Sequence, residues 1–200
     1  LFWPIIQKIE NISGKKYEGN ERPMRIIADH LRAATFVIAD RIITSNTEQG
    51  YVLRRLIRRA IRFGKMLGVE KNFTTEVAGE AVKVMEKVYP ELRENWEKIR
   101  EELSKEEERF SKTLDRGIKE FGKIKDISGE KAFFLYETYG FPLELTMEMA
   151  KEKGVTVDEE GFKKAMAEHQ QKSRTGAEKK FSGGLADQSE ITTKYHTATH

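Results

Sequence analysis

Residues 46–64 read NTEQGYVLRRLIRRAIRFG and carry the clearest helical pattern in the chain. Turn and capping residue types open the stretch, and a Leu-Gly pair at 67–68 follows it, so a helix is predicted over 48–66. Apolar side chains recur on one face, and the other face gathers Arg54, Arg55, Arg58, Arg59, Arg62 and Lys65. One face is therefore expected to pack, and the other to offer positive charge.

Helical periodicity extends over most of the chain, which predicts an all-α protein, a multi-helix bundle with one long helix. Further helices are expected at about 24–43, 74–88 and 158–172. The long helix is expected over 91–125, with Ser104 as the candidate break. The stretch 132–154 predicts two helices around a tight turn at YGFP, and no segment shows a convincing strand pattern.

Composition limits the classes of function. The formal net charge is only +3, so attraction to a nucleic acid or a membrane must come from local patches. The chain has no cysteine, which excludes disulfides and thiolate metal sites from this chain alone and fits a cytoplasmic protein. No apolar run approaches the roughly 18 residues of a membrane span. The chain opens inside an apolar helical pattern and stops inside HTATH, so we expect a segment of a longer protein.

The basic face of the helix at 48–66 has several interpretations. Arginine favours forked contact with phosphates or carboxylates, so the face could bind nucleic acid or form internal salt bridges with acids such as those at 106–108. A merely solvated face is the third interpretation. An anionic membrane surface fits worst, because the apolar face has no aromatic belt. The run EEE at 106–108 is most simply a solvated face.

The second candidate site is HTATH at the end of the chain. His196 and His200 are four residues apart, which on a helix places both imidazoles on one face, as two ligands of one zinc ion require. Two ligands make half of a tetrahedral site. His30 and His169 lie in helical patterns and are expected to be packed or surface histidines. No phosphate-binding glycine loop or nucleophile elbow occurs, so no catalytic residue is assigned.

Five long strings occur along the chain in a distinctive order and spacing: MRIIADHLRAATFVIADRI, SNTEQGYVLRRLIRRAIRFGKMLG, EEERFSKTLDRGI, AFFLYETYGFPLELT and VDEEGFKKAM. Together they resemble the alanyl-tRNA synthetase family. The resemblance covers nearly all of residues 1–172, and KYHTATH at 194–200 resembles the opening zinc motif of the family's editing domain.

The resemblance implies an organisation and a function. Residues 1–172 would form the helical domain that recognises the tRNA acceptor stem, 173–194 a linker, and 195–200 the start of the zinc-dependent editing domain. The class II catalytic core, with ATP, magnesium and alanine, would lie before the first residue. The partners would be the acceptor stem of alanine tRNA and the missing catalytic and editing domains. The alternatives are a non-enzymatic helical RNA-binding module and part of a free-standing deacylase.

The resemblance also implies two base-reading residues. In the family an Asn and an Asp hold the G:U wobble pair of the acceptor stem, and these positions match Asn46 and Glu137 here. A wobble pair exposes the guanine amine in the minor groove, which is accessible in RNA, and an amide oxygen and a carboxylate are suitable acceptors. Glu137 is one methylene longer than the usual Asp. Without the resemblance, Asn46 would be a turn or cap residue, and Glu137 a local capping or pairing residue. The basic residues listed above would hold the RNA backbone.

Overall fold

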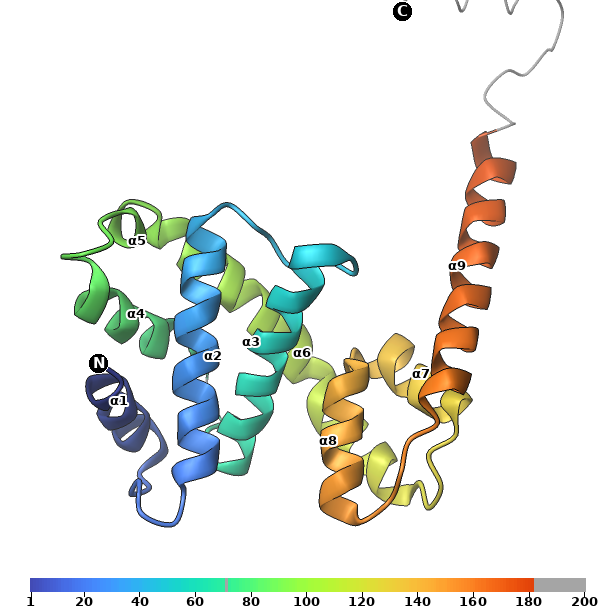
Figure 1. Cartoon of the computed structure of the whole chain (residues 1–200), viewed down its shortest axis with the longest axis horizontal. Coiled ribbons are helices and arrows are strands. Elements are labelled where there is room, and N and C mark those ends of the chain that lie inside the picture. Colours follow the sequence, from blue (N-terminus) through green and yellow to red (C-terminus); the bar gives the residue numbers. More distant parts are fainter. Residues whose placement is uncertain (71, 182–200) are drawn as a thin grey trace, which may run out of the picture.

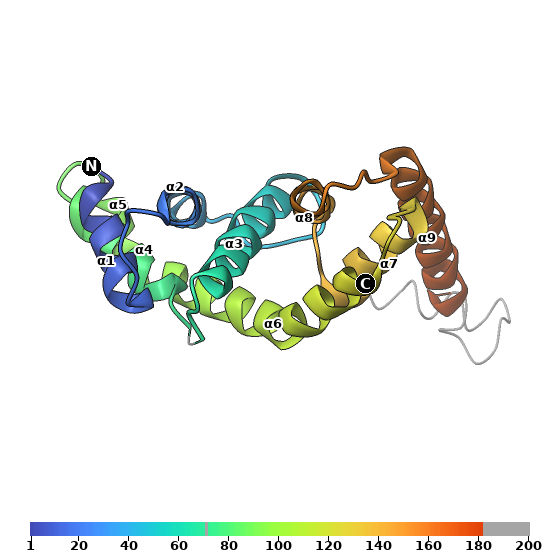
Figure 2. The same cartoon turned by 90° about the horizontal axis from the view of Figure 1, so that it is seen from below.

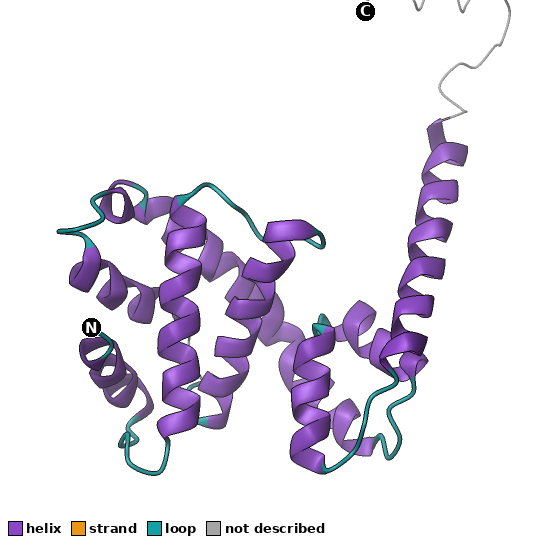
Figure 3. Cartoon of the chain, viewed as in Figure 1, coloured by secondary structure: helices purple, strands orange, loops and turns teal. Residues whose placement is uncertain are grey.

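The computed structural model describes residues 1–70 and 72–181, and within them it contains helices joined by short connections and no strand (Figure 3). The all-α prediction is confirmed. Figure 1 labels the helices, whose bounds are α1 Trp3–Ser13, α2 Glu21–Ala39, α3 Glu48–Met66, α4 Thr74–Met85, α5 Glu91–Glu94, α6 Trp96–Lys123, α7 Gly129–Tyr139, α8 Leu143–Lys153 and α9 Glu159–Phe181.

The helix predicted over 48–66 is confirmed as α3, and it ends before Gly68, whose φ of 82° suits glycine alone without strain. The break expected at Ser104 is wrong: the interruption falls at Asn95, between α5 and α6. There the Asn95 side chain donates to the Glu91 carbonyl oxygen (2.9 Å). Ser104 lies within the continuous helix α6, and the nearby residues Leu103 and Glu106 face the interior. The last helix runs to Phe181 and so continues into the first part of the predicted linker.

The fold consists of two helical groups that share α6. In the first group α2 lies centrally and packs against α1, α3 and α4, while α6 packs against α2, α3 and α4. The second group is α7, α8 and α9, with α7 packed against α6 and α9 (Figure 2). Buried side chains of α2, α3 and α6 form the core between them, including Met24, Ile27, Leu31, Leu53, Ile57 and Phe110.

Close backbone approaches fix the second group on α6. Gly117 of α6 lies directly under the Phe141 ring, so that a side chain there would collide with the ring. Phe141 also stacks edge-on against Phe110 at 5.7 Å between ring centroids. At the other end of α7, Gly129 contacts the backbone of Gly161 at the start of α9. These contacts determine where the turn between α7 and α8 meets α3.

Candidate functional site

All six basic residues of α3 are paired with carboxylates of other helices. Side-chain pairs join Arg55 to Glu144 (2.7 Å), Arg58 to Glu106 (2.6 Å), Arg59 to Glu148 (2.7 Å), Arg62 to Glu152, Lys65 to Asp115 (3.1 Å) and Arg54 to Glu106 (3.5 Å). Internal salt bridges, one of the interpretations of the sequence, are therefore present along the whole face. The side chains of Arg55, Arg59 and Lys65 keep exposures of 37, 31 and 40%, whereas Arg62 keeps 6%.

The prediction that residues 106–108 form a solvated face is wrong for two of the three. Glu106 is fully buried and accepts hydrogen bonds from Arg58 Nε (2.6 Å) and Thr44 Oγ1 (3.2 Å). Arg54 Nε lies 3.5 Å from the same carboxylate but makes no hydrogen bond. Two guanidinium groups and a hydroxyl satisfy the buried charge, as a buried carboxylate requires. Only Glu108 is exposed, as predicted.

Glu107 is 2% exposed and caps α4 from a distance in sequence. Its carboxylate accepts from the backbone amides of Phe73 (3.0 Å) and Thr74 (3.1 Å) and from the Thr74 hydroxyl. Backbone amides at the first turn of a helix have no acceptor within the helix, so Glu107 satisfies donors of α4 that would otherwise lack a partner. Burial raises the pKa of Glu107, and the bonds from Thr74 and Phe73 oppose that rise. Glu107 therefore binds α6 to α4 and is not available to a ligand.

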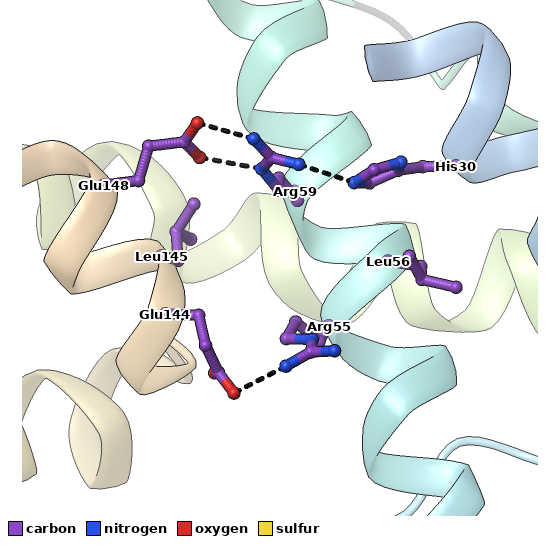
Figure 4. Close-up of a pocket in the computed structure, with 7 residues that line it drawn as sticks. All are labelled: His30, Arg55, Leu56, Arg59, Glu144, Leu145 and Glu148. Carbon is purple, nitrogen blue, oxygen red and sulfur yellow. Dashed lines mark hydrogen bonds and ion pairs between the residues drawn. The ribbon is translucent and has the colours of Figure 1, made fainter.

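The contact between α3 and α8 is a ladder of ion pairs beside a cavity of about 400 Å³ (Figure 4). Glu144 and Glu148 project from successive turns of α8 and meet Arg55 and Arg59. Burial is the largest single influence on Glu148 and raises its pKa, but the hydrogen bonds from Arg59 and the charges of three nearby arginines together lower that pKa. The ladder thus joins the second helical group to the first at this contact.

His30 of α2 completes the ladder. Its Nε2 lies 2.8 Å from Arg59, and because guanidinium only donates, Nε2 is the acceptor and the ring is neutral. Its Nδ1 then faces Asp29 at 3.3 Å. Burial, and next the charge of Arg59, lower the pKa of His30. Of the two alternatives that the sequence left open for His30, packed or surface, the structure shows the packed one.

The loop before α3 is held on two sides and carries Asn46 at its exposed end. On one side, the Thr44 amide and hydroxyl donate to Glu102 of α6 at 2.7 and 2.6 Å. On the other, the Ser45 amide donates to the Gly50 carbonyl oxygen (3.1 Å), and the loop packs so closely on Gly50 that a Cβ there would collide with Ser45. The loop is therefore anchored to both α3 and α6.

Asn46 is exposed and is not the cap of α3, since Thr47 occupies the N-cap position. The Asn46 Oδ1 accepts a hydrogen bond from an Arg54 guanidinium nitrogen. Burial raises the pKa of the Tyr136 hydroxyl of α7, and the charges of Arg54 and Arg58 oppose that rise. Arg54 therefore holds Asn46 directly, and its charge also reaches α7, the helix that carries Glu137.

Glu137 is half exposed, and its Oε1 lies 3.1 Å from Nε2 of His169 on α9, which is equally exposed. The pairing is not local in sequence. The His169 ring also packs against Phe133, 5.4 Å between centroids, which helps to place α9 beside α7. Both proposed base-reading side chains therefore have one nitrogen partner and remain accessible to solvent.

A family model described as tRNA synthetases class II (A) matches residues 1–200. The chain belongs to this family. The chain is 49% identical over its whole length to an alanine–tRNA ligase of Borreliella afzelii (strain PKo), and it covers 35% of that protein. It is 50% identical to the alanine–tRNA ligase of Treponema denticola, covering 36% of it. The match to the enzyme of Acaryochloris marina is 48% over 88% of the chain.

This synthetase chain thus spans about a third of the length of the first two of these curated relatives. The relatives are named as ligases, which favours the synthetase interpretation over the RNA-binding module and the deacylase. The two predicted zinc ligands, His196 and His200, lie outside the described residues. Among the residues described, no group of three or more His, Cys, Asp or Glu side chains is placed to hold a metal ion, and no helix is long and apolar enough to cross a membrane.

Sequence reasoning named the acids at 106–108 as possible salt-bridge partners of the arginines, which Glu106 bears out, but it preferred a solvated face for them and missed the carboxylates of α8. Glu106 is three residues after Leu103 and four before Phe110, both buried, so helical spacing already places it on the inner face of α6. That spacing could have decided between the two interpretations. The acids of α8 gave no comparable signal, because their partners lie about ninety residues away in sequence.

Proposed function

We propose that this chain is the acceptor-stem recognition segment of an alanine–tRNA ligase, an enzyme that attaches alanine to its tRNA with ATP. The whole-chain match to the class II synthetase family, with relatives named alanine–tRNA ligase, carries this proposal. On this account adenylate formation, with ATP and magnesium, is performed by residues outside these 200. The editing zinc would use His196 and His200 with further ligands also outside them.

Asn46 is proposed as one reader of the G:U pair. An amide oxygen has two lone pairs, and Arg54 uses one, so Oδ1 keeps one acceptor position for a guanine amine. The double anchoring of the loop, to Glu102 and to Gly50, reduces the ordering cost on binding.

Glu137 is proposed as the second reader. The Glu137 carboxylate contacts His169 through Oε1, and exposed contacts of this kind contribute little, about 0–1 kcal/mol. A guanine amine can therefore bind the carboxylate without a large loss. The extra methylene relative to the usual Asp is accommodated by a side chain that projects from the last turns of α7 into solvent.

The basic residues of α3 fall into two groups according to how exposed their side chains are to an RNA backbone. Arg55, Arg59 and Lys65 are the basic residues of α3 with the most accessible side chains, and these are proposed to touch phosphates first. Arg54, Arg58 and Arg62 are mostly buried in carboxylate pairs, with exposures of 15, 13 and 6%. Their contribution to RNA binding is therefore proposed to be indirect, through the position of the loop and of α8.

The test compares two hairpins that carry the alanine acceptor stem, identical except for G:U or G:C at the wobble position. The 200-residue chain is expected to bind the G:U hairpin more tightly by about 5- to 150-fold, the range for one good base contact of about 1–3 kcal/mol. Equal affinity for the two hairpins contradicts the proposed readout.

A further inference from the structure

A second basic surface lies on α6, and none of the predictions from sequence identified it. Cationic residues recur every three, four or seven positions along the helix, which places them in an arc of about 80° at 100° per residue. All are exposed, and Glu101 is the one exposed acidic residue of α6 within that arc. We call this surface the α6 stripe; its members are Lys98, Lys105, Arg109, Lys112, Arg116, Lys119 and Lys123.

The stripe faces away from the core. The buried residues of the same helix, among them Leu103, Phe110 and Leu114, lie on the opposite side. Figure 2 shows α6 along the outer edge of the molecule, with α2 and α3 on its inner side. With a rise of 1.5 Å per residue, the stripe extends over about 37 Å. It is therefore an open, elongated surface of one charge sign.

The stripe is less neutralised than the arginines of α3. Within residues 1–70 and 72–173, no carboxylate pairs with Lys105, Arg109 or Lys119. Lys112 and Lys123 pair only with glutamates on their own helix, where both partners are accessible to solvent. Such exposed pairs contribute little to stability, and the lysine can exchange its glutamate for a phosphate at little cost.

One end of the stripe meets the loop that carries Asn46. Arg41, Lys98 and Lys105 line one hollow of about 350 Å³, in which Glu101 and Glu102 are the acidic members. Glu102 is already engaged by Thr44. The hollow therefore connects the stripe to the anchored loop through accessible positive charge.

Arg41 takes an unfavourable backbone conformation at this point. Its φ is 66°, in the left-handed region that glycine or asparagine usually occupies after a helix. Its amide closes the end of α2 by donating to the Ile38 carbonyl oxygen (2.8 Å). An arginine there costs backbone energy that a glycine would avoid, which is consistent with a use for its side chain.

We propose that the α6 stripe, with Arg41, binds the phosphate backbone of an RNA duplex whose wobble pair is read at Asn46. The inference rests on the proposed function and adds electrostatic contacts on α6 to those proposed for the exposed basic residues of α3. Charge complementarity, the uncovered length of the stripe and its continuity with the Asn46 loop all favour a long polyanion. A-form RNA presents its backbone on both sides of a wide, shallow minor groove, which suits contact at a base edge and along a strand together.

The test neutralises the three cations that no carboxylate pairs with, in the triple variant Lys105→Gln, Arg109→Gln and Lys119→Gln. The matched control removes the same charge from exposed lysines elsewhere, in the triple variant Lys15→Gln, Lys87→Gln and Lys151→Gln. Affinity for the G:U and G:C hairpins is measured between 50 and 200 mM salt. Each lost phosphate contact reduces the salt slope by about 0.7–0.9.

The parent chain should bind more tightly than the stripe variant at 50 mM salt. If three contacts are lost in the variant, this advantage should fall by about 20- to 40-fold when the salt is raised to 200 mM, and equally on both hairpins. A stripe variant with the same slope as the control variant overturns the inference. Binding of phosphatidylserine vesicles that depends on the stripe, with unchanged RNA binding, also overturns it in favour of a membrane. If the parent chain binds both hairpins equally but the stripe variant binds them more weakly than the control variant, the result supports the stripe and refutes the base readout.

Arg41→Gly provides a second, independent measurement. The substitution removes a cation and at the same time relieves the positive φ, so the chain is expected to fold at least as stably as the parent. RNA affinity should nevertheless fall with a salt slope lower by about one. If neither the affinity nor the salt slope changes, Arg41 is not part of the RNA-binding surface.

Discussion

Glu106→Gln tests the finding that a buried carboxylate organises this surface. The substitution keeps the size of the side chain and one acceptor oxygen, but it removes the charge that faces Arg54 and Arg58. Loss of a partner from a buried pair costs about 3–5 kcal/mol. The loss here should be smaller, because Arg58 also donates to the Gly140 carbonyl oxygen and lies 5.1 Å from the centre of the Phe110 ring.

We therefore expect Glu106→Gln to lower the free energy of unfolding by about 2–4 kcal/mol. Glu108→Gln is the matched control. It removes the same charge from the same helix, but Glu108 is 64% exposed and pairs only with Lys112 four residues on. Its cost should be much smaller, because both members of that pair are exposed to solvent.

The assay is urea unfolding followed by circular dichroism at 222 nm, with both variants and the parent in one buffer. A change in the midpoint at constant slope reports stability. In thermal unfolding the larger loss corresponds to roughly 5–15 °C for a chain of this size. If Glu106→Gln and Glu108→Gln agree within about 0.5 kcal/mol, Glu106 does not carry the buried pairing described above.

Three further perturbations follow from the same contacts. Gly50→Ala should destabilise the fold by about 1–3 kcal/mol in urea unfolding, because the new methyl group collides with the loop at Ser45; an unchanged midpoint would mean that the loop is not packed there. The pKa of His30 is lowered in the folded chain, so as the pH falls the unfolded chain takes up this proton before the folded chain does. Stability should therefore fall as the pH drops below about 6.5 towards the folded pKa. Urea midpoints from pH 8 to 5 test this, and a His30→Gln variant with the same pH profile as the parent refutes it. Glu148→Gln should cost about 1.5–3 kcal/mol through its 12% exposed, arginine-bonded carboxylate, whereas Glu144→Gln, 43% exposed, should cost below about 1; the reverse order would contradict the ladder.

Local signals predicted the helices well where capping residues mark their ends. The bounds of α3 followed from the turn residues before Glu48 and from Gly68, and α8 ended at Gly154 as expected. The interruption in the long helix was misplaced, because Ser104 is a weak helix former whose tertiary neighbours decide its state.

The electrostatics of the site could be predicted only in part. Sequence spacing showed that the arginines of α3 share a face, but the carboxylates that occupy them come from α6 and α8, which only the tertiary fold brings close. The stripe on α6 was hidden for a different reason. Its acidic neighbours make the composition of that segment look neutral, and the charge separates only when the helical arrangement places the cations on one side.

The most direct test of the account is the discrimination ratio, the affinity for the G:U hairpin divided by that for the G:C hairpin, in the parent and in Asn46→Ala. The account predicts that Asn46→Ala removes about 1–3 kcal/mol of discrimination while binding to the G:C hairpin stays within about twofold of the parent. Serving as the control, the α6 stripe variant should lose affinity for both hairpins and keep the ratio. An unchanged ratio in Asn46→Ala, or an equal loss on both hairpins, would contradict the claim that this exposed residue reads the base pair.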